Sequence, residues 1–93
     1  MAQNKKYAAV KALLEAGGVV HIADIFEYVP KSSTYKLLNV GYLSFLKKLD
    51  NPGLFTIEEL IILSELIGVH EDVIITLAKN EAKELHKKRK NRG

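Results

Sequence analysis

The stretch Lys31–Leu49, KSSTYKLLNVGYLSFLKKL, decides how the rest of the chain is interpreted. It holds four lysines and no acidic residue, although the 93-residue chain has 14 Lys and Arg against 11 Asp and Glu. Its apolar residues recur at helical spacing on both sides of Asn39-Val40-Gly41, which predicts two short helices with a tight break between them. A rigid helical corner with one basic face suits the DNA backbone and major groove, so DNA binding is our leading hypothesis.

Length and composition predict one small domain, residues 1–86, followed by a basic tail, residues 87–93. The chain has no cysteine, which excludes disulfides and thiolate metal sites. No apolar run approaches the roughly 18 residues of a membrane-spanning helix. Lys11 and Glu15 interrupt the apolar residues near the N-terminus, which argues against a signal peptide. We therefore expect a cytoplasmic protein with no membrane partner.

Charge is distributed unevenly along the chain. Residues 79–93 carry seven bases and two acids, a net charge of +5, and the remaining 78 residues carry seven bases and nine acids, a net charge of −2. This asymmetry favours an anionic partner. The tail after Leu85 loses the apolar period, so we expect a frayed helix end and a disordered terminus. That terminus could bind DNA backbone, RNA or another acidic partner, or it could serve only solubility.

Helical periodicity and its stop signals predict an all-α fold, a compact bundle of five or six short helices with a central helix-turn-helix at about residues 31–50. Gly17-Gly18, Pro30 and Gly68 are the clearest stops. Thr56 and Glu59 form a capping box at the start of one helix. The expected helices cover residues 3 or 4 to 15 or 16, 20–28, 31–38, 42–50, 57–67 and 71 to about 85.

Within the central stretch, periodicity divides inward from outward positions. Asn39 should take the left-handed conformation that ends a helix, and Val40 should be buried. The residues predicted to face inward are Thr34, Leu37, Leu38, Tyr42, Phe45, Leu46 and Leu49. Within the helix at residues 42–50, the residues predicted to face outward are Leu43, Ser44, Lys47 and Lys48.

From Val20 to Leu77 the chain resembles small bacterial regulators with a helix-turn-helix of the Cro/phage-repressor type. The resemblance lies in Leu37-Leu38-Asn39-Val40, in Phe45 and Leu49, and in FTIEELIILSELIGVHEDVI, residues 55–74. With PKSS before the corner and NPGLFTIEEL after it, the chain is similar to small proteins of anaerobic gut bacteria. The resemblance implies transcriptional regulation, with residues 31–38 as the scaffold helix and residues 42–50 as the recognition helix.

The resemblance also implies the binding residues, because recognition helices of this type enter the major groove with their early residues near base edges. That role maps to Tyr42, Leu43 and Ser44, with phosphate contacts from Lys31, Ser32, Ser33, Lys36, Lys47 and Lys48. Three positions depart from the family pattern. Tyr35 replaces a small residue, Asn39 replaces a glycine, and residues 43 and 44 lack the Gln, Asn or Arg that reads a base through two hydrogen bonds. We expect weak sequence readout, or readout helped by DNA shape.

Several alternatives remain open at this stage. The lysines could be ordinary solvated side chains, and the fold could serve as a protein-interaction module without DNA binding. We expect a homodimer through the last two helices, although one core could absorb most of their apolar residues. We expect no enzyme activity, cofactor, metal or small-molecule ligand. The chain has no Gly-rich phosphate loop, and its histidines, His21, His70 and His86, have no ligand spacing. Capping and the helix dipole explain the acids at helix starts, which are Glu58, Glu59, Glu71 and Asp72.

Overall fold

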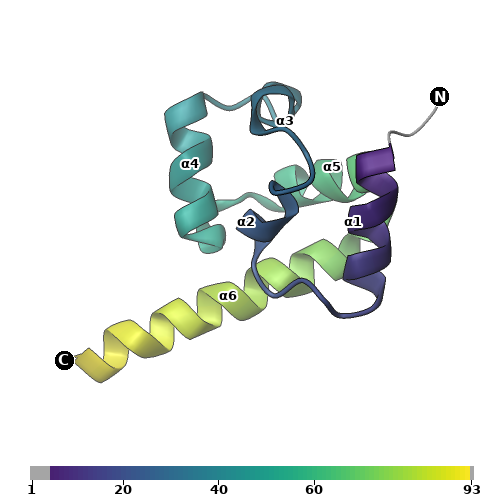
Figure 1. Ribbon diagram of the computed structural model, residues 1–93. Coiled ribbons are helices and arrows are strands. Elements are labelled where there is room, and N and C mark those ends of the chain that lie inside the picture. Colours follow the sequence, from purple (N-terminus) through teal and green to yellow (C-terminus); the bar gives the residue numbers. More distant parts are fainter. Residues whose placement is uncertain (1–4, 93) are drawn as a thin grey trace.

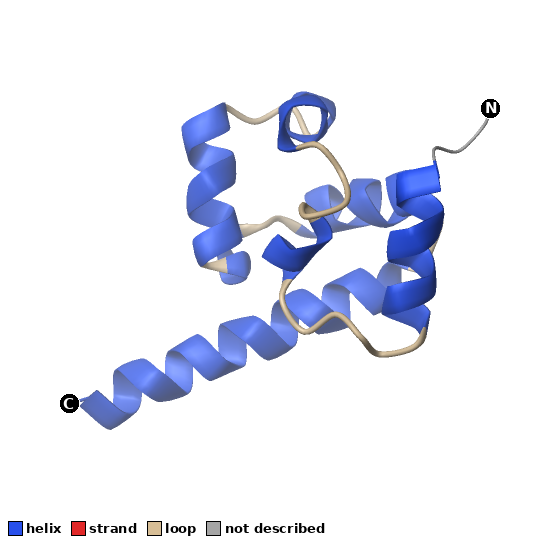
Figure 2. Cartoon of the chain, viewed as in Figure 1, coloured by secondary structure: helices blue, strands red, loops and turns tan. Residues whose placement is uncertain are grey.

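The computed structural model describes the backbone of residues 5–92 and the side chains of residues 7–88. This part of the chain is helical without strands, which confirms the all-α prediction (Figure 2). The caps predicted at Gln3 or Asn4 lie outside the described residues. The elements are α1 (Lys5–Glu15), α2 (Ile22–Ile25), α3 (Lys31–Leu37), α4 (Tyr42–Asp50), the 3-10 helix η1 (Pro52–Leu54), α5 (Ile57–Ile67) and α6 (Glu71–Arg92).

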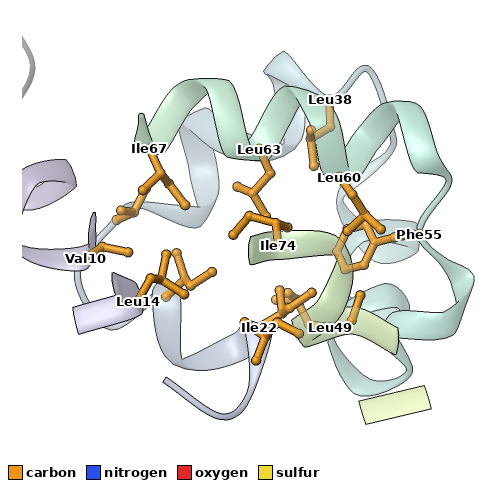
Figure 3. Packing of buried hydrophobic residues seen from close by; sticks show 14 of the residues in the cluster. Val10, Leu14, Ile22, Leu38, Leu49, Phe55, Leu60, Leu63, Ile67 and Ile74 are labelled. Atoms are coloured by element: carbon orange, nitrogen blue, oxygen red, sulfur yellow. The ribbon is translucent and has the colours of Figure 1, made fainter. Parts of the chain in front are cut away.

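Helix α6 runs along the base of the molecule, and the other helices gather on one side of it (Figure 1). The core draws on residues from most of the chain. Figure 3 shows buried side chains of α1, α2, α4, α5 and α6 gathered around Ile74, which is fully buried. Phe45, Ile22 and Ile25 are also completely excluded from solvent. Burial of such residues supplies most of the favourable free energy of folding, about 1.5–3 kcal/mol for each large side chain.

Helix α2 is much shorter than the predicted span of residues 20–28. His21 occupies its N-cap position but makes no side-chain capping hydrogen bond. After Ile25 the backbone turns through i→i+3 hydrogen bonds, with the Glu27 N–H donating to the Asp24 carbonyl at 3.2 Å. Pro30 then disfavours helical geometry at Val29. The predicted inward residues of this segment are nevertheless buried or half-buried, because short turns keep the same face toward the core.

Helix α5 has the capping box expected from its sequence. The Thr56 hydroxyl accepts a hydrogen bond from the Glu59 N–H at 3.1 Å, and the Glu59 carboxylate accepts one from the Thr56 N–H at 2.9 Å. The helix ends at Gly68, whose φ of 90° lies in the left-handed region that glycine adopts without strain. Both ends of α5 are therefore set by local residues.

Helix α6 differs from the prediction at its C-terminal end. It continues as helix to Arg92, beyond Leu85 and through most of the segment expected to be a disordered tail. The apolar period does end there, but Lys, Arg and Glu are good helix formers. They favour continued helix in this segment, which projects past the other helices (Figure 1).

The capping box gives a direct test of what starts α5. Thr56→Ala removes the hydroxyl acceptor and should lower the free energy of unfolding by about 1 kcal/mol. Thr76→Ala is the matched control, since Thr76 is exposed in the N-terminal half of α6. Urea denaturation followed by circular dichroism measures both. Equal effects of the two substitutions would contradict a special role for Thr56.

Candidate nucleic-acid interface

Helices α3 and α4 form the predicted corner. In Figure 1 α3 is seen end-on while α4 lies lengthwise, so their axes cross steeply. Asn39 has a φ of 60°, which confirms the left-handed conformation predicted for it. The Asn39 N–H donates to the Lys36 carbonyl at 3.1 Å, and the Val40 N–H donates to the Tyr35 carbonyl at 3.3 Å. These bonds close the end of α3 and fix the direction in which the chain leaves it. Val40 itself is only half-buried, not the fully buried residue expected.

An aromatic cluster holds the corner against the core. The Tyr35 ring lies 5.3 Å from Tyr42 and 6.4 Å from Phe45, centroid to centroid. Phe45 also meets Phe26 edge-on at 5.2 Å. Tyr35 is therefore accommodated by packing against two rings of α4. Such edge-to-face pairs add about 0.5–1.5 kcal/mol each beyond burial.

Thr34 anchors the other side of α3. Its side chain is completely buried, and its hydroxyl donates to the Pro30 carbonyl at 2.9 Å. Leu38, one turn further along, is also buried, so both residues face inward as predicted. Leu37 does not, since it is 52% exposed. The prediction for Leu37 was wrong because α3 has only two turns, and its inward face is filled by Thr34, Tyr35 and Leu38.

Most of the predicted binding residues are exposed on the surface of α3 and α4. Tyr42 was also placed in the inward stripe, but the structure leaves it 45% exposed with its ring against Tyr35. Leu43 is the most exposed large apolar residue of the described chain, at 73%. We call this surface the corner face. It consists of Lys31, Ser32, Ser33, Lys36, Tyr42, Leu43, Ser44 and Lys47.

Lys48 does not belong to the corner face, and its predicted outward position was wrong. Its ammonium group lies 2.7 Å from both carboxylate oxygens of Glu59, and only 16% of its side chain is exposed. Glu59 is itself buried. The ion pair joins the last turn of α4 to the first turn of α5. Helical periodicity could not reveal it, because the two residues belong to different helices.

The surroundings of Glu59 set its protonation. Burial raises the pKa of its carboxyl. Hydrogen bonds from Lys48 and Thr56, together with the positive charge of Lys48, lower the pKa by more than burial raises it. The net result is a pKa below its ordinary value of 4.5. Glu59 is thus ionised at neutral pH and keeps Lys48 engaged.

A partly buried acid connects α2 to α6. The Glu81 carboxylate accepts hydrogen bonds from the Ile22 N–H and, at 3.1 Å, from His21 Nδ1. Glu81 thereby satisfies the free N–H at the start of α2, where the local sequence offers no capping side chain. His21 is exposed, as predicted for a helix-terminal histidine. Within residues 7–88 no cluster of three or more His, Asp or Glu side chains could hold a metal ion.

An apolar hollow of about 360 Å³ lies where η1 meets α5 and α6, which sequence analysis did not detect. Phe55, Ile75 and Lys79 are among its lining residues. Ile57, which also lines the hollow, is 60% exposed. No periodic signal marks this hollow, because η1 is an irregular segment that packs across two helices.

Comparisons with models of protein families, with curated proteins and with solved structures found no match. Among the residues that the structure describes, no helix is both long and apolar enough to cross a membrane. The function proposed below therefore rests on the sequence and geometry of this chain.

The Lys48–Glu59 pair predicts a specific pH dependence of stability. Because the folded pKa of Glu59 lies below that of the unfolded chain, its contribution is complete above about pH 4.5 and is lost as the pH falls through the folded pKa. Glu59→Gln should lower the free energy of unfolding by about 1–3 kcal/mol at neutral pH. The difference from wild type should shrink in acid. Urea denaturation across this pH range measures it.

Glu58→Gln is the matched control, since Glu58 is the exposed neighbour of Glu59. It should leave the acid response close to that of wild type. A constant difference between wild type and Glu59→Gln from neutral to acid pH would contradict the assigned role of the ion pair.

Proposed function

We propose that the protein binds duplex DNA through the corner face, with α4 in the major groove. The observation that carries the proposal is an exposed surface with three lysines on a rigid helical corner, within a stretch of 19 residues, Lys31–Leu49, that contains no acid. A helix with side chains is about 10–12 Å wide, which matches the roughly 12 Å width of the major groove. Lys31, Lys36 and Lys47 supply the charges that phosphate groups require.

In this arrangement the lysines position the protein and the first turn of α4 meets the bases. Leu43 offers methyl groups suited to the thymine methyl, and Ser44 offers a hydroxyl that can donate or accept. Neither makes the paired hydrogen bonds that discriminate strongly between bases. Phosphate contacts therefore dominate affinity, and sequence preference comes largely from DNA shape.

The proposed biological role is transcriptional regulation in the cytoplasm of a bacterium. It is supported by the arrangement of α3, the left-handed Asn39 and α4, which has the order expected from the resemblance to Cro/phage-repressor-type regulators. Steric occupation of a promoter by such a small protein would need no enzymatic step.

A protein-interaction module is the other candidate, and the corner supplies its specific support. Leu37, Tyr42 and Leu43 are all large apolar side chains with substantial exposure near the turn. Exposed apolar groups in one place are typical of surfaces that contact other proteins. A protein partner would rely on these residues and would be insensitive to the lysines.

Charge reversal separates the two candidates. Lys36→Glu with Lys47→Glu should weaken binding to random-sequence duplex DNA and reduce the slope of log affinity against log salt by about 2, since each lost phosphate contact removes about 0.9. Fluorescence anisotropy at several salt concentrations measures this. Lys11→Glu is the control, because Lys11 is exposed on α1. Failure of wild-type protein to bind duplex at low salt would contradict the proposal.

We also propose that two copies associate through α5 and α6. The hollow beside η1 is apolar, and Ile57 projects at its edge. About a two-fold axis, Ile57 of each copy can enter the hollow of the other. Glu58, exposed next to Ile57, and Lys79, in the wall of the hollow, have opposite charges and could pair across the same axis.

Sedimentation velocity over a range of concentrations tests this association. Ile57→Asp should shift the protein toward monomer, while an aspartate in the first turn of α5 is favourable for the helix. Val20→Asp is the control, since Val20 is 63% exposed and lies outside α5, α6 and η1. A wild-type protein that stays monomeric at the highest concentration would overturn the proposal.

A further inference from the structure

Leu43 is an apolar side chain that the core of the protein does not use. It is 73% exposed, whereas Phe45, two residues further along α4, is fully buried. Two residues turn an α-helix by about 200°, so Leu43 projects almost directly away from the core. Only apolar surface that is removed from water contributes to folding, and most of Leu43 stays in water. Its apolar surface is therefore left for contact with another molecule.

The surroundings of Leu43 are polar and positively charged. Ser44 is exposed beside it, and Lys47, one turn later, is exposed on the same side of α4. Asp50 is on that side too, but it lies about 10 Å further along the helix axis and lines a hollow with His21. A leucine among hydroxyl and ammonium groups, with the acid only at the far end of the helix, suits an anionic partner that also presents a small apolar group.

The first turn of α4 holds Leu43 in a fixed position. The Tyr42 ring packs against Tyr35 at 5.3 Å, and the Phe45 ring meets Phe26 edge-on at 5.2 Å, both between ring centroids. Aromatic contacts therefore anchor the helix immediately before Leu43 and two residues after it. A group that is positioned in advance loses little conformational entropy on binding, so even a small apolar contact adds to affinity.

We propose that Leu43 reads the C5 methyl group of a pyrimidine, thymine or 5-methylcytosine, in the major groove. The inference rests on the proposed function and deepens it, because it names the residue and the chemical group behind a direct sequence preference. The thymine methyl is an apolar group on the major-groove edge of a base pair. Leucine has no donor or acceptor, so it cannot replace the water bound to the polar edge of an unmethylated G·C pair.

The test uses two short duplexes of alternating adenine and thymine, one of them with uracil in place of every thymine. Uracil pairs with adenine as thymine does and lacks only the C5 methyl. Wild-type protein should bind the thymine duplex about fourfold more tightly, the equivalent of burying one CH₂ group. Leu43→Ala should bring this ratio close to one, and Leu43→Met, which stays apolar, should retain most of it. Fluorescence anisotropy measures the affinities.

Leu54→Ala is the matched control, since Leu54 is a 52% exposed leucine of η1, outside α3 and α4. It should keep the wild-type ratio. A second pair of duplexes has one mixed G·C sequence, with cytosine or with 5-methylcytosine. Wild-type protein should prefer the methylated duplex, and Leu43→Ala should not. Circular dichroism checks that the variants remain folded.

The outcomes separate this inference from the proposed function. Equal affinity of wild type for the thymine and uracil duplexes, with steep salt dependence, would overturn methyl reading and leave the proposed function standing. A thymine preference that survives in Leu43→Ala would assign the preference to DNA shape or to another residue, and would overturn the role of Leu43. If wild type binds neither duplex at low salt, the proposed function fails and the inference fails with it. The exposed Leu43 would then favour the protein-interaction candidate.

Discussion

Glu59 is the residue on which the placement of the candidate interface depends. Its carboxylate accepts a hydrogen bond from the N–H of Thr56, the N-cap residue of α5, and pairs with Lys48 in the last turn of α4. One buried acid thus fixes both the beginning of one helix and the position of the helix before it. Removal of either partner would leave the other charge largely buried without compensation, which is far more costly than loss of a surface ion pair. The direction of α4 therefore depends in part on Glu59, a residue outside the helix-turn-helix.

The corner has an unusual construction for a tight crossing of two helices. A small residue normally permits close approach, but here Tyr35 lies between the helices and makes aromatic contacts with α4. Asn39 closes α3 in the left-handed conformation that glycine would adopt more easily. The corner is thus held in part by side-chain packing. Its outer surface combines lysines with exposed Leu37 and Leu43, so charge and apolar area are offered together.

Two acids of α5 and α6 have partners on other elements. Glu59 pairs with Lys48 of α4, and Glu81 accepts a hydrogen bond from the Ile22 N–H at the start of α2. Lys31, Lys36 and Lys47 of the corner face are exposed instead. A modest net charge of +3 is compatible with a locally positive corner, because residues 31–49 contain no acid.

The sequence by itself determined the elements whose causes are local. The capping box at Thr56, the left-handed Asn39, the bounds of α4 and α5 and the exposure of residues 43, 44 and 47 follow from periodicity and end signals within a few residues. The tertiary structure alone decided the features that join distant segments, namely the pairing of Lys48 with Glu59, the capping of α2 by Glu81 and the hollow beside η1. Periodicity assigns a residue to a face of its own helix, but it contains no information about which charge of another helix that face will meet. Lys48 was misplaced for this physical reason.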